Sequence, residues 1–228
     1  LSSMGNKPKE KFLINFFSLD LDYKKMLKEI SKDKIIESAI KRSFGLRITN
    51  QDLFQCMISF ICSSASNVPK IKRNILSISK SFGKPVTFKD KQLFLFPLPK
   101  QISDLELIKQ SSAGFRSKYI YQCSQIATKE LLERIKSIDY ADAKKILMSF
   151  NGIGDKVSEC ICLFSLKFYD AFPVDVWIKR ETERLYFNGA VKPKEFITSF
   201  FKRYFGQYAG YAQEFLFYSA RNEPKSVK

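Results

Sequence analysis

The sequence predicts an all-α protein, and two observations carry this prediction. Apolar residues recur at helical spacing along nearly the whole chain. Only one stretch, 92–99 (QLFLFPLP), is typical of a strand, and it is too short and too rich in proline to found a sheet. Because the chain has 228 residues, of which 45% are hydrophobic, it can bury a core in one large domain or two small ones.

Helices are expected where an apolar stripe follows a polar residue that can cap it. Asn50 is the candidate N-cap of a helix over 52–64, and 68–82 repeats the period. Ser103 and Glu106 have the spacing of a capping box and predict a short helix. The stripes contain Leu53, Met57, Phe60 and Ile61, then Val68, Ile71, Ile75 and Ile78. Further helices are expected near 116–128, 141–149, 155–168, 175–187, 194–204 and 209–220.

The domain organisation is expected to be simple, because the sequence contains no internal repeat and no low-complexity linker. Residues 1–13 and 222–228 are basic and are expected to be tails. The residues between them, 14–221, are expected to form the helical domain, with a hairpin of two helices at 141–168.

The charge balance points to a polyanionic partner. The chain has 39 Lys and Arg against 23 Asp and Glu, a net charge of +16. Such an excess favours nucleic acid over a membrane surface, although a lysine-rich soluble surface is the alternative. We find no run near the roughly 18 apolar residues of a membrane span and no signal-peptide pattern. We therefore expect no membrane partner. We also expect the protein to be intracellular and to act as a monomer.

The cysteine and histidine counts exclude several kinds of chemistry. The five cysteines are odd in number, form no paired CxxC groups and lie mostly in apolar helical patterns, which is typical of reduced core residues. The chain contains no histidine. Zinc sites and iron–sulfur clusters are therefore not expected, and every mechanism that uses a histidine base is excluded.

The stretch FNGIGDKVSEC, 150–160, predicts a tight turn between two helices. Gly152 and Gly154 flank Ile153, which would anchor the turn in the core. Glycine lets a backbone approach another molecule closely, and the amides at the start of the second helix can bind a phosphate. This arrangement is the helix-hairpin-helix grip on a DNA backbone. Glycine-rich turns between helices are common, so a purely structural turn remains the alternative.

Lys156 and Asp175 add a chemical interpretation to the hairpin. A lysine in the first turn of a helix is disfavoured by the dipole, and the neutral amine that this field favours is the form that attacks carbon. A solvated lysine that contacts phosphate is the alternative. Asp175 is placed to cap the next helix, and its carboxylate could also stabilise positive charge that develops on a sugar.

These motifs resemble those of the eukaryotic-type 8-oxoguanine DNA glycosylases, within the helix-hairpin-helix DNA glycosylase superfamily. The similarity rests on GIGDKVSECICL and PVDVW, and it extends over FFSLDLDY, LFQCMISFICSS, GFRSKYI and GQYAGYAQEFLFYSA in the family's order, from about residue 14 to 221. The resemblance implies two helical subdomains with the active site in the cleft between them. It also implies excision of 8-oxoguanine from duplex DNA, followed by β-elimination (AP lyase) through a Schiff base.

The resemblance assigns roles to five residues. Lys156 matches the nucleophile that attacks C1′, and Asp175 matches the aspartate that supports the oxocarbenium-like transition state. Cys160 matches the residue that stacks on the extruded base, Gln213 the amide that reads its Watson–Crick edge, and Phe217 the stacking phenylalanine. Core packing or a solvated amide would explain any one of the last three, but their joint match favours a base pocket.

Contacts with DNA are implied for the hairpin and for two loops. Gly152 and Gly154 lie in the backbone grip, Phe115 matches the aromatic residue that fills the stack, and Arg116 matches the arginine that contacts the orphaned cytosine. The loop after the ICSS helix, including Asn67 and Lys70, is expected to lie on the same face. No side-chain metal site or other cofactor is expected, but the family implies a sodium or potassium ion at the backbone carbonyls of Met148, Phe150 and Ile153.

The chain departs from the family in three places. Only some fifteen residues precede FFSLDLDY, so most of the N-terminal β-rich domain of longer members is expected to be missing. Ala65 and Lys70 stand where those members have an asparagine and an arginine, and Trp177 replaces a histidine. Two other functions remain open: the same fold acting on another oxidised or alkylated base, and a non-catalytic helix-hairpin-helix DNA-binding module.

Overall fold

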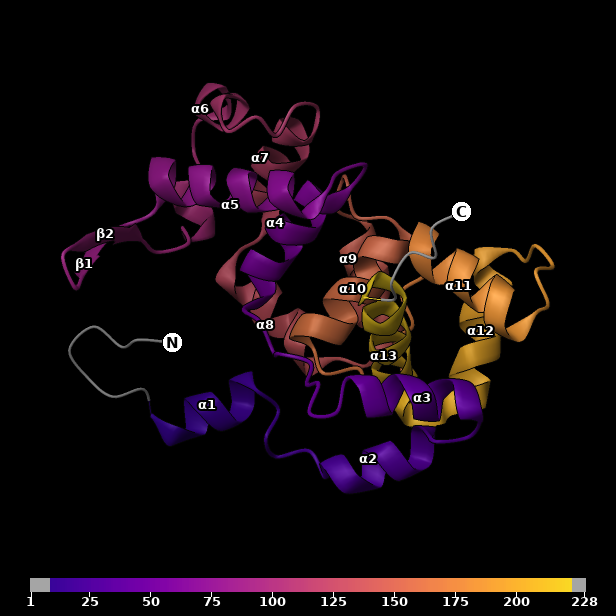
Figure 1. Cartoon of the computed structure of the whole chain (residues 1–228). Coiled ribbons are helices and arrows are strands. Elements are labelled where there is room, and N and C mark those ends of the chain that lie inside the picture. Colours follow the sequence, from indigo (N-terminus) through magenta and orange to yellow (C-terminus); the bar gives the residue numbers. More distant parts are fainter. Residues whose placement is uncertain (1–8, 223–228) are drawn as a thin grey trace. The chain divides into compact units, whose positions relative to one another are not determined.

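The computed structural model describes residues 9–222, which form two compact units (Figure 1). Among the described residues, unit 1 consists of Gln51–Ile161 with Lys9 and Glu10, and unit 2 consists of Lys11–Asn50 and residues 162–222. Nearly all regular structure is helical, which confirms the all-α prediction. Most of the two expected tails, 1–8 and 223–228, lies outside the described residues.

Unit 1 is built around α4, whose buried residues include Leu53, Met57 and Ile61. This helix packs against α5 and α7. The hairpin helices α9 and α10 belong to the same unit up to Ile161. The elements are α4 (Leu53–Ser63), α5 (Val68–Phe82), β1 (Pro85–Phe88), β2 (Lys91–Phe94), η1 (Pro99–Gln101), α6 (Leu105–Gln110), α7 (Arg116–Ile126), α8 (Lys129–Ser137), α9 (Tyr140–Met148) and α10 (Asp155–Ser165).

Unit 2 is built around α13, which packs against α3, α11 and α12. Its core is aromatic: the rings of Phe172 and Phe201 stack with their centroids 4.9 Å apart, and Tyr211 and Phe215 are fully buried. The elements are α1 (Glu10–Phe16), α2 (Tyr23–Ile30), α3 (Lys34–Arg42), α11 (Val176–Tyr186), α12 (Lys194–Phe205), η2 (Gly206–Tyr208) and α13 (Ala209–Asn222).

Two of the expected caps are wrong by one or two positions. Asp52, not Asn50, caps α4, because its carboxylate lies directly before the first helical residue and accepts the Gln55 amide at 2.9 Å. Asp104, not Ser103, caps α6 and accepts the amides of Glu106 and Leu107. In both cases the helix-start amides donate to the aspartate directly before the helix, and not to the polar residue further upstream.

Other differences concern elements with weak sequence signals. β2 covers only 91–94, and it pairs with β1 in an isolated antiparallel hairpin. Lys89 and Asp90 both have positive φ in its two-residue turn, the geometry that such hairpins favour. The short charged helices α1, α2, α3 and α8 were not expected, and α1 includes residues 10–13, which were assigned to a tail. The buried apolar face of α5 is also smaller than expected, since Val68, which was expected to belong to it, is 42% exposed.

Candidate active site and nucleic-acid interface

The hairpin turn uses its two glycines differently. Gly152 has φ +87°, and a Cβ there would lie 2.8–2.9 Å from the Tyr119 ring. Ile153 is buried, as expected, and donates its amide to the Phe150 carbonyl at 3.0 Å. A Cβ at Gly154 would meet nothing within 4 Å. Gly152 is therefore required by the turn, whereas Gly154 keeps the surface before α10 free of a side chain, as a phosphate approaching the helix amides requires.

Lys156 lies in the first turn of α10, as the sequence predicted, and it is half-buried. Its Nζ is 5.4 Å from the centre of the Phe60 ring, which α4 supplies. Cys160 follows one turn later on the same helix and is buried as a reduced cysteine. The structure thus holds the amine of Lys156 beside an aromatic ring and places the thiol of Cys160 on the same helix face.

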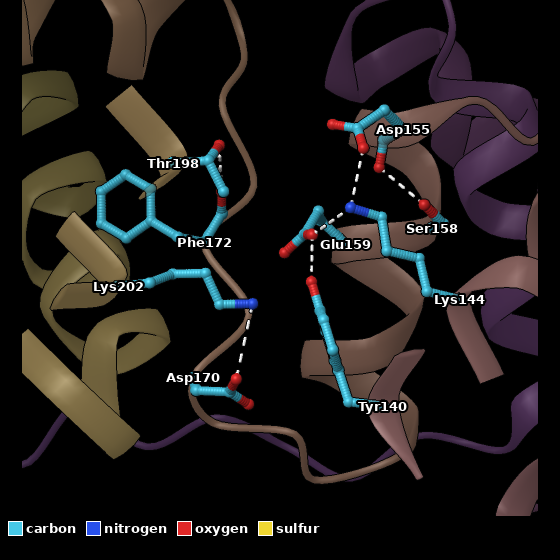
Figure 2. Close-up of polar contacts among 9 residues, drawn as sticks. All are labelled: Tyr140, Lys144, Asp155, Ser158, Glu159, Asp170, Phe172, Thr198 and Lys202. Atoms are coloured by element: carbon cyan, nitrogen blue, oxygen red, sulfur yellow. Dashed lines mark hydrogen bonds and ion pairs between the residues drawn. The ribbon is translucent and has the colours of Figure 1, made fainter. Parts of the chain in front are cut away.

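A polar cluster that the sequence analysis missed joins α9 to α10 (Figure 2). Lys144 of α9 places its Nζ 2.7 Å from Oδ1 of Asp155 and 2.6 Å from Oε1 of Glu159. The Tyr140 hydroxyl donates to the same Glu159 oxygen, and the Glu159 side chain is only 1% exposed. Burial by itself lowers the pKa of Lys144, but its hydrogen bonds to the two carboxylates raise it above the usual value.

The cluster had a detectable signal in the sequence. Asp155 and Glu159 are four residues apart and therefore share one face of α10, and Lys144 and Tyr140 share one face of α9 in the same way. Acidic residues facing basic and hydroxyl residues across a predicted hairpin would have indicated this contact.

Asp175 is the N-cap of α11, because its Oδ1 accepts the Ile178 amide at 2.8 Å. The segment before it is anchored to α12 (Figure 2): Lys202 lies 3.4 Å from the Asp170 carboxylate, and the Thr198 hydroxyl donates to the Phe172 carbonyl at 3.4 Å. The capping role expected from the sequence is present. That Asp175 also acts on a sugar stays a prediction.

Gln213 lies on α13 with its side chain 4% exposed. Its Oε1 is buried and has no hydrogen-bond partner among the described residues. A buried acceptor without a donor costs free energy, on the order of 1–3 kcal/mol, so an oxygen held in this state is suited to a ligand that brings a donor. Phe217, one turn later, is half-buried, with the Arg221 guanidinium 5.5 Å from its ring centre.

The start of α13 approaches the loop between α10 and α11 closely because residue 210 is glycine. The Gly210 amide donates to the Tyr169 carbonyl at 2.8 Å. A Cβ at this position would lie 2.6 Å from the Ala171 carbonyl oxygen and 2.4 Å from Leu163. The glycine therefore sets the position of the helix segment that carries Gln213.

Phe115 and Arg116 at the start of α7 differ sharply. The Phe115 side chain is 59% exposed, as a residue that enters a base stack must be. Arg116 is 3% exposed: its Nε donates to the Ser64 carbonyl at 2.7 Å, and Nη2 donates to the Ala65 carbonyl at 2.9 Å. Nη1 donates to the Ala113 carbonyl at 3.1 Å. The guanidinium of Arg116 is thus engaged by the backbone of its own unit, and its expected contact with a base stays a prediction.

The loop held by Arg116 carries the other residues expected at the DNA face. Ala65 has φ +45° and is exposed. Asn67 is exposed and caps α5, since its Oδ1 accepts the Lys70 amide at 3.0 Å. The Asn67 side-chain oxygen therefore has a structural role, and a DNA contact by Asn67 or Lys70 stays a prediction.

The predicted site residues fall into two sets. Unit 1 contains Lys156, Cys160, Gly152, Gly154, Phe115, Arg116, Asn67 and Lys70, and unit 2 contains Asp175, Gln213 and Phe217. Within the range 9–222 we find no cluster of three or more His, Cys, Asp or Glu side chains suited to a metal ion. The same residues include no helix long and apolar enough to cross a bilayer.

Comparisons with known proteins relate this chain to 8-oxoguanine glycosylases and N-glycosylase/DNA lyases. Residues 2–57 match the family model of the 8-oxoguanine DNA glycosylase N-terminal domain. A probable N-glycosylase/DNA lyase of Methanothermobacter thermautotrophicus is 30% identical over 83% of this chain, and the N-glycosylase/DNA lyase of Saccharomyces cerevisiae is 29% identical over 90%. The chain spans about two thirds of the length of these relatives, 68% and 65% respectively.

A solved structure extends the similarity to the fold. The Clostridium acetobutylicum 8-oxoguanine glycosylase/lyase, in complex with double-stranded DNA containing cytosine opposite 8-oxoguanine, superposes with a TM-score of 0.89. The match has 33% identity and covers 96% of this chain and 80% of that chain. The helix-hairpin-helix glycosylase fold predicted from the sequence is therefore confirmed.

Proposed function

This chain belongs to the 8-oxoguanine DNA glycosylase family, and from that premise we propose that it removes 8-oxoguanine from duplex DNA and then nicks the strand as an AP lyase. The observation that carries the proposal is the position of Lys156. Lys156 lies two residues after Gly154, in the first turn of α10. Gly154 has no side chain, so a DNA backbone can approach the start of this helix. A nucleophile beside a phosphate grip is what attack on a nucleotide sugar requires.

The reaction begins with the neutral amine of Lys156. Its lone pair forms a bond to C1′, the bond from C1′ to the base nitrogen breaks, and the base leaves with that electron pair and takes up a proton. The nitrogen then gives up a proton, its lone pair forms the C=N bond as the C1′–O4′ bond breaks, and O4′ takes up a proton, which gives a protonated Schiff base between Lys156 and C1′. Loss of a C2′ proton then expels the 3′ phosphate by β-elimination, and water releases the nicked strand from the lysine. Asp175 is the group proposed to stabilise positive charge on the sugar.

Gln213 is proposed to read the extruded base. A guanine presents N–H donors on its Watson–Crick edge, and the buried Oε1 of Gln213 is an acceptor without a partner among residues 9–222. Cys160 and Phe217 are the proposed stacking groups. Because the N–H donors of guanine suit the acceptor Oε1 of Gln213, this pairing supports a guanine-type base.

The DNA partner is held by backbone and charge in this proposal. The first amides of α10 bind phosphate, and Phe115 fills the gap left in the stack. The net charge of +16 supports binding to a polyanion, and such a substrate places the protein inside the cell. The protein is proposed to act as a monomer.

A sodium or potassium ion is proposed at the hairpin carbonyls of Met148, Phe150 and Ile153. Carbonyl oxygens suit such hard cations, and the Phe150 carbonyl keeps a second lone pair after it accepts the Ile153 amide. The ion would fix the turn and contribute positive charge near a phosphate. No step of the chemistry uses it, and no other cofactor is proposed.

Excision assays with a nucleophile variant test the proposal. Wild type and Lys156→Gln are compared on duplexes with 8-oxoguanine, an oxidised pyrimidine or an alkylated purine, with borohydride present to trap the Schiff base. We expect 8-oxoguanine to be preferred, and we expect Lys156→Gln to lose excision and trapping while it retains DNA binding. Preference for another lesion would support the same fold with a different substrate, and binding without any cleavage would support a non-catalytic module.

A further inference from the structure

We propose that Lys144 is a positioning residue, which fixes the rotation of α10 and so aims the amine of Lys156. The inference rests on the proposed function and concerns how this chain holds its nucleophile. Lys144 is on α9, the other helix of the hairpin, and its ion-pair partners among the described residues are carboxylates, whereas the amine of Lys156 lies over the Phe60 ring. It acts through Asp155 and Glu159, its two carboxylate partners.

The geometry of α10 connects these groups. Asp155 and Glu159 are four residues apart and share the face that meets Lys144 (Figure 2). Lys156 and Cys160 are each one residue further along, which turns their face by about 100° around the helix axis. Any rotation of α10 that moved the carboxylates away from Lys144 would therefore swing the amine of Lys156 by the same angle.

The rotation of α10 about its axis is fixed by side-chain contacts and not by the backbone of the turn. The two helices are joined only by the short turn from Ser149 to Gly154. Within the turn, Ile153 is anchored in the core, but Gly154 next to α10 has no side chain to hold the helix start. The ammonium of Lys144 links α10 to α9 through both carboxylates, alongside the Tyr140 hydroxyl on Glu159 and the packing of buried residues such as Val157 and Ile161.

The two carboxylates differ in what they contribute. The Glu159 side chain is 1% exposed and also accepts the Tyr140 hydroxyl, so its charge is shielded from water and is balanced by groups of the protein, Lys144 among them. The Asp155 side chain is 61% exposed, where water competes for the charge. The link between Lys144 and Glu159 is therefore the stronger one. The raised pKa of Lys144 keeps its amine charged throughout the neutral range.

The test compares Lys144→Met with Lys145→Met, which removes the same charge from an exposed position on the same helix. Single-turnover excision of 8-oxoguanine, borohydride trapping on a preformed abasic duplex, and affinity for a tetrahydrofuran-containing duplex are measured for each. Because a displacement of about 1 Å can cost on the order of a hundredfold in rate, we expect Lys144→Met to slow both chemical steps about 10- to 100-fold. The affinity should change less than about threefold, since the helix-start amides lie near the helix axis and point along it, so that a rotation displaces them far less than the long side chain of Lys156.

Rescue separates positioning from general stability. Lys144→Arg can bridge both carboxylates and should recover most of the rate, whereas Lys145→Met should stay close to wild type. If Lys144→Met does not fold, Glu159→Gln removes the buried charge at constant volume and should show the same loss of rate. Chemical rates in Lys144→Met equal to those in Lys145→Met, or rate and affinity lost together without rescue by arginine, would overturn the proposal. If the wild type does not excise 8-oxoguanine, the proposed substrate is wrong. Borohydride trapping on abasic DNA would still test whether Lys144 positions the amine of Lys156.

Discussion

Gln213 and Arg116 are both buried, and their hydrogen bonding distinguishes a side chain suited to a ligand from one that supports the fold. Gln213 keeps a buried oxygen without a partner among the described residues, although an unsatisfied acceptor is costly. Arg116 has the opposite state: a buried guanidinium whose donors go to three backbone carbonyls. The Gln213 oxygen is therefore suited to a ligand that brings a donor, whereas Arg116 holds the loop at Ser64 and Ala65 in place.

Replacing Gln213 by alanine should impair excision of 8-oxoguanine more than cleavage at a preformed abasic site. An abasic site has no base for the amide to read, while loss of a hydrogen bond to a buried base edge costs about 1–3 kcal/mol, or roughly five- to 150-fold in rate. Single-turnover rates on the two substrates measure this difference. Equal losses on both would mean that Gln213 supports the structure and does not read the base.

Discrimination of the base opposite the lesion should be weak. Ala65 offers no hydrogen-bonding side chain, Lys70 lacks the planar fork of an arginine, and the Arg116 guanidinium is engaged by carbonyls. Each missing base contact removes about 1–3 kcal/mol of discrimination. We expect excision rates from four duplexes that differ only in the opposite base to agree within about tenfold. A cytosine preference above about a hundredfold would show that Ser66, Asn67 or a rearranged Arg116 contacts the base.

At the scale of helices, the sequence predicted strong amphipathic elements well and charged or short ones poorly. α5 was expected at 68–82 and forms there, because its period is sustained over four turns. α2 was missed because its lysine-rich sequence buries only Met26 and Ile30. The hairpin was identified from Gly152 and Lys156, whereas the contacts of Arg116 depend on carbonyls some fifty residues away, which no local pattern indicates.

Cys62 of α4 and Cys123 of α7 should be unreactive in the folded protein. Burial raises the pKa of the Cys62 thiol to about 12, although Arg116 opposes the shift, and burial alone raises the pKa of Cys123 to about 12. At pH 8 only about one such thiol in ten thousand is the reactive thiolate. We expect Ellman's reagent to modify these two cysteines slowly in native protein and quickly after unfolding in guanidinium. Rapid native modification mapped to either peptide would contradict the burial.

For the whole molecule, the excess of positive charge should appear as a steep salt dependence of DNA binding. The net charge is +16, and a lysine or arginine that neutralises a phosphate releases condensed counterions. With roughly four to six phosphate contacts, the slope of log K against log salt should be about −4 to −5. Titrations of a labelled duplex between low and physiological salt provide the slope. A value near zero would remove the nucleic-acid explanation of the charge.

The central claim is that the amine of Lys156 attacks the sugar. It is tested most directly by trapping the intermediate on an 8-oxoguanine duplex with borohydride, digesting the complex, and identifying by mass spectrometry the residue that carries the sugar remnant. The account predicts one adduct, on Lys156 in the peptide that follows the Gly152–Gly154 turn. An adduct on another lysine or on the terminal amine, with Lys156 unmodified, would contradict it.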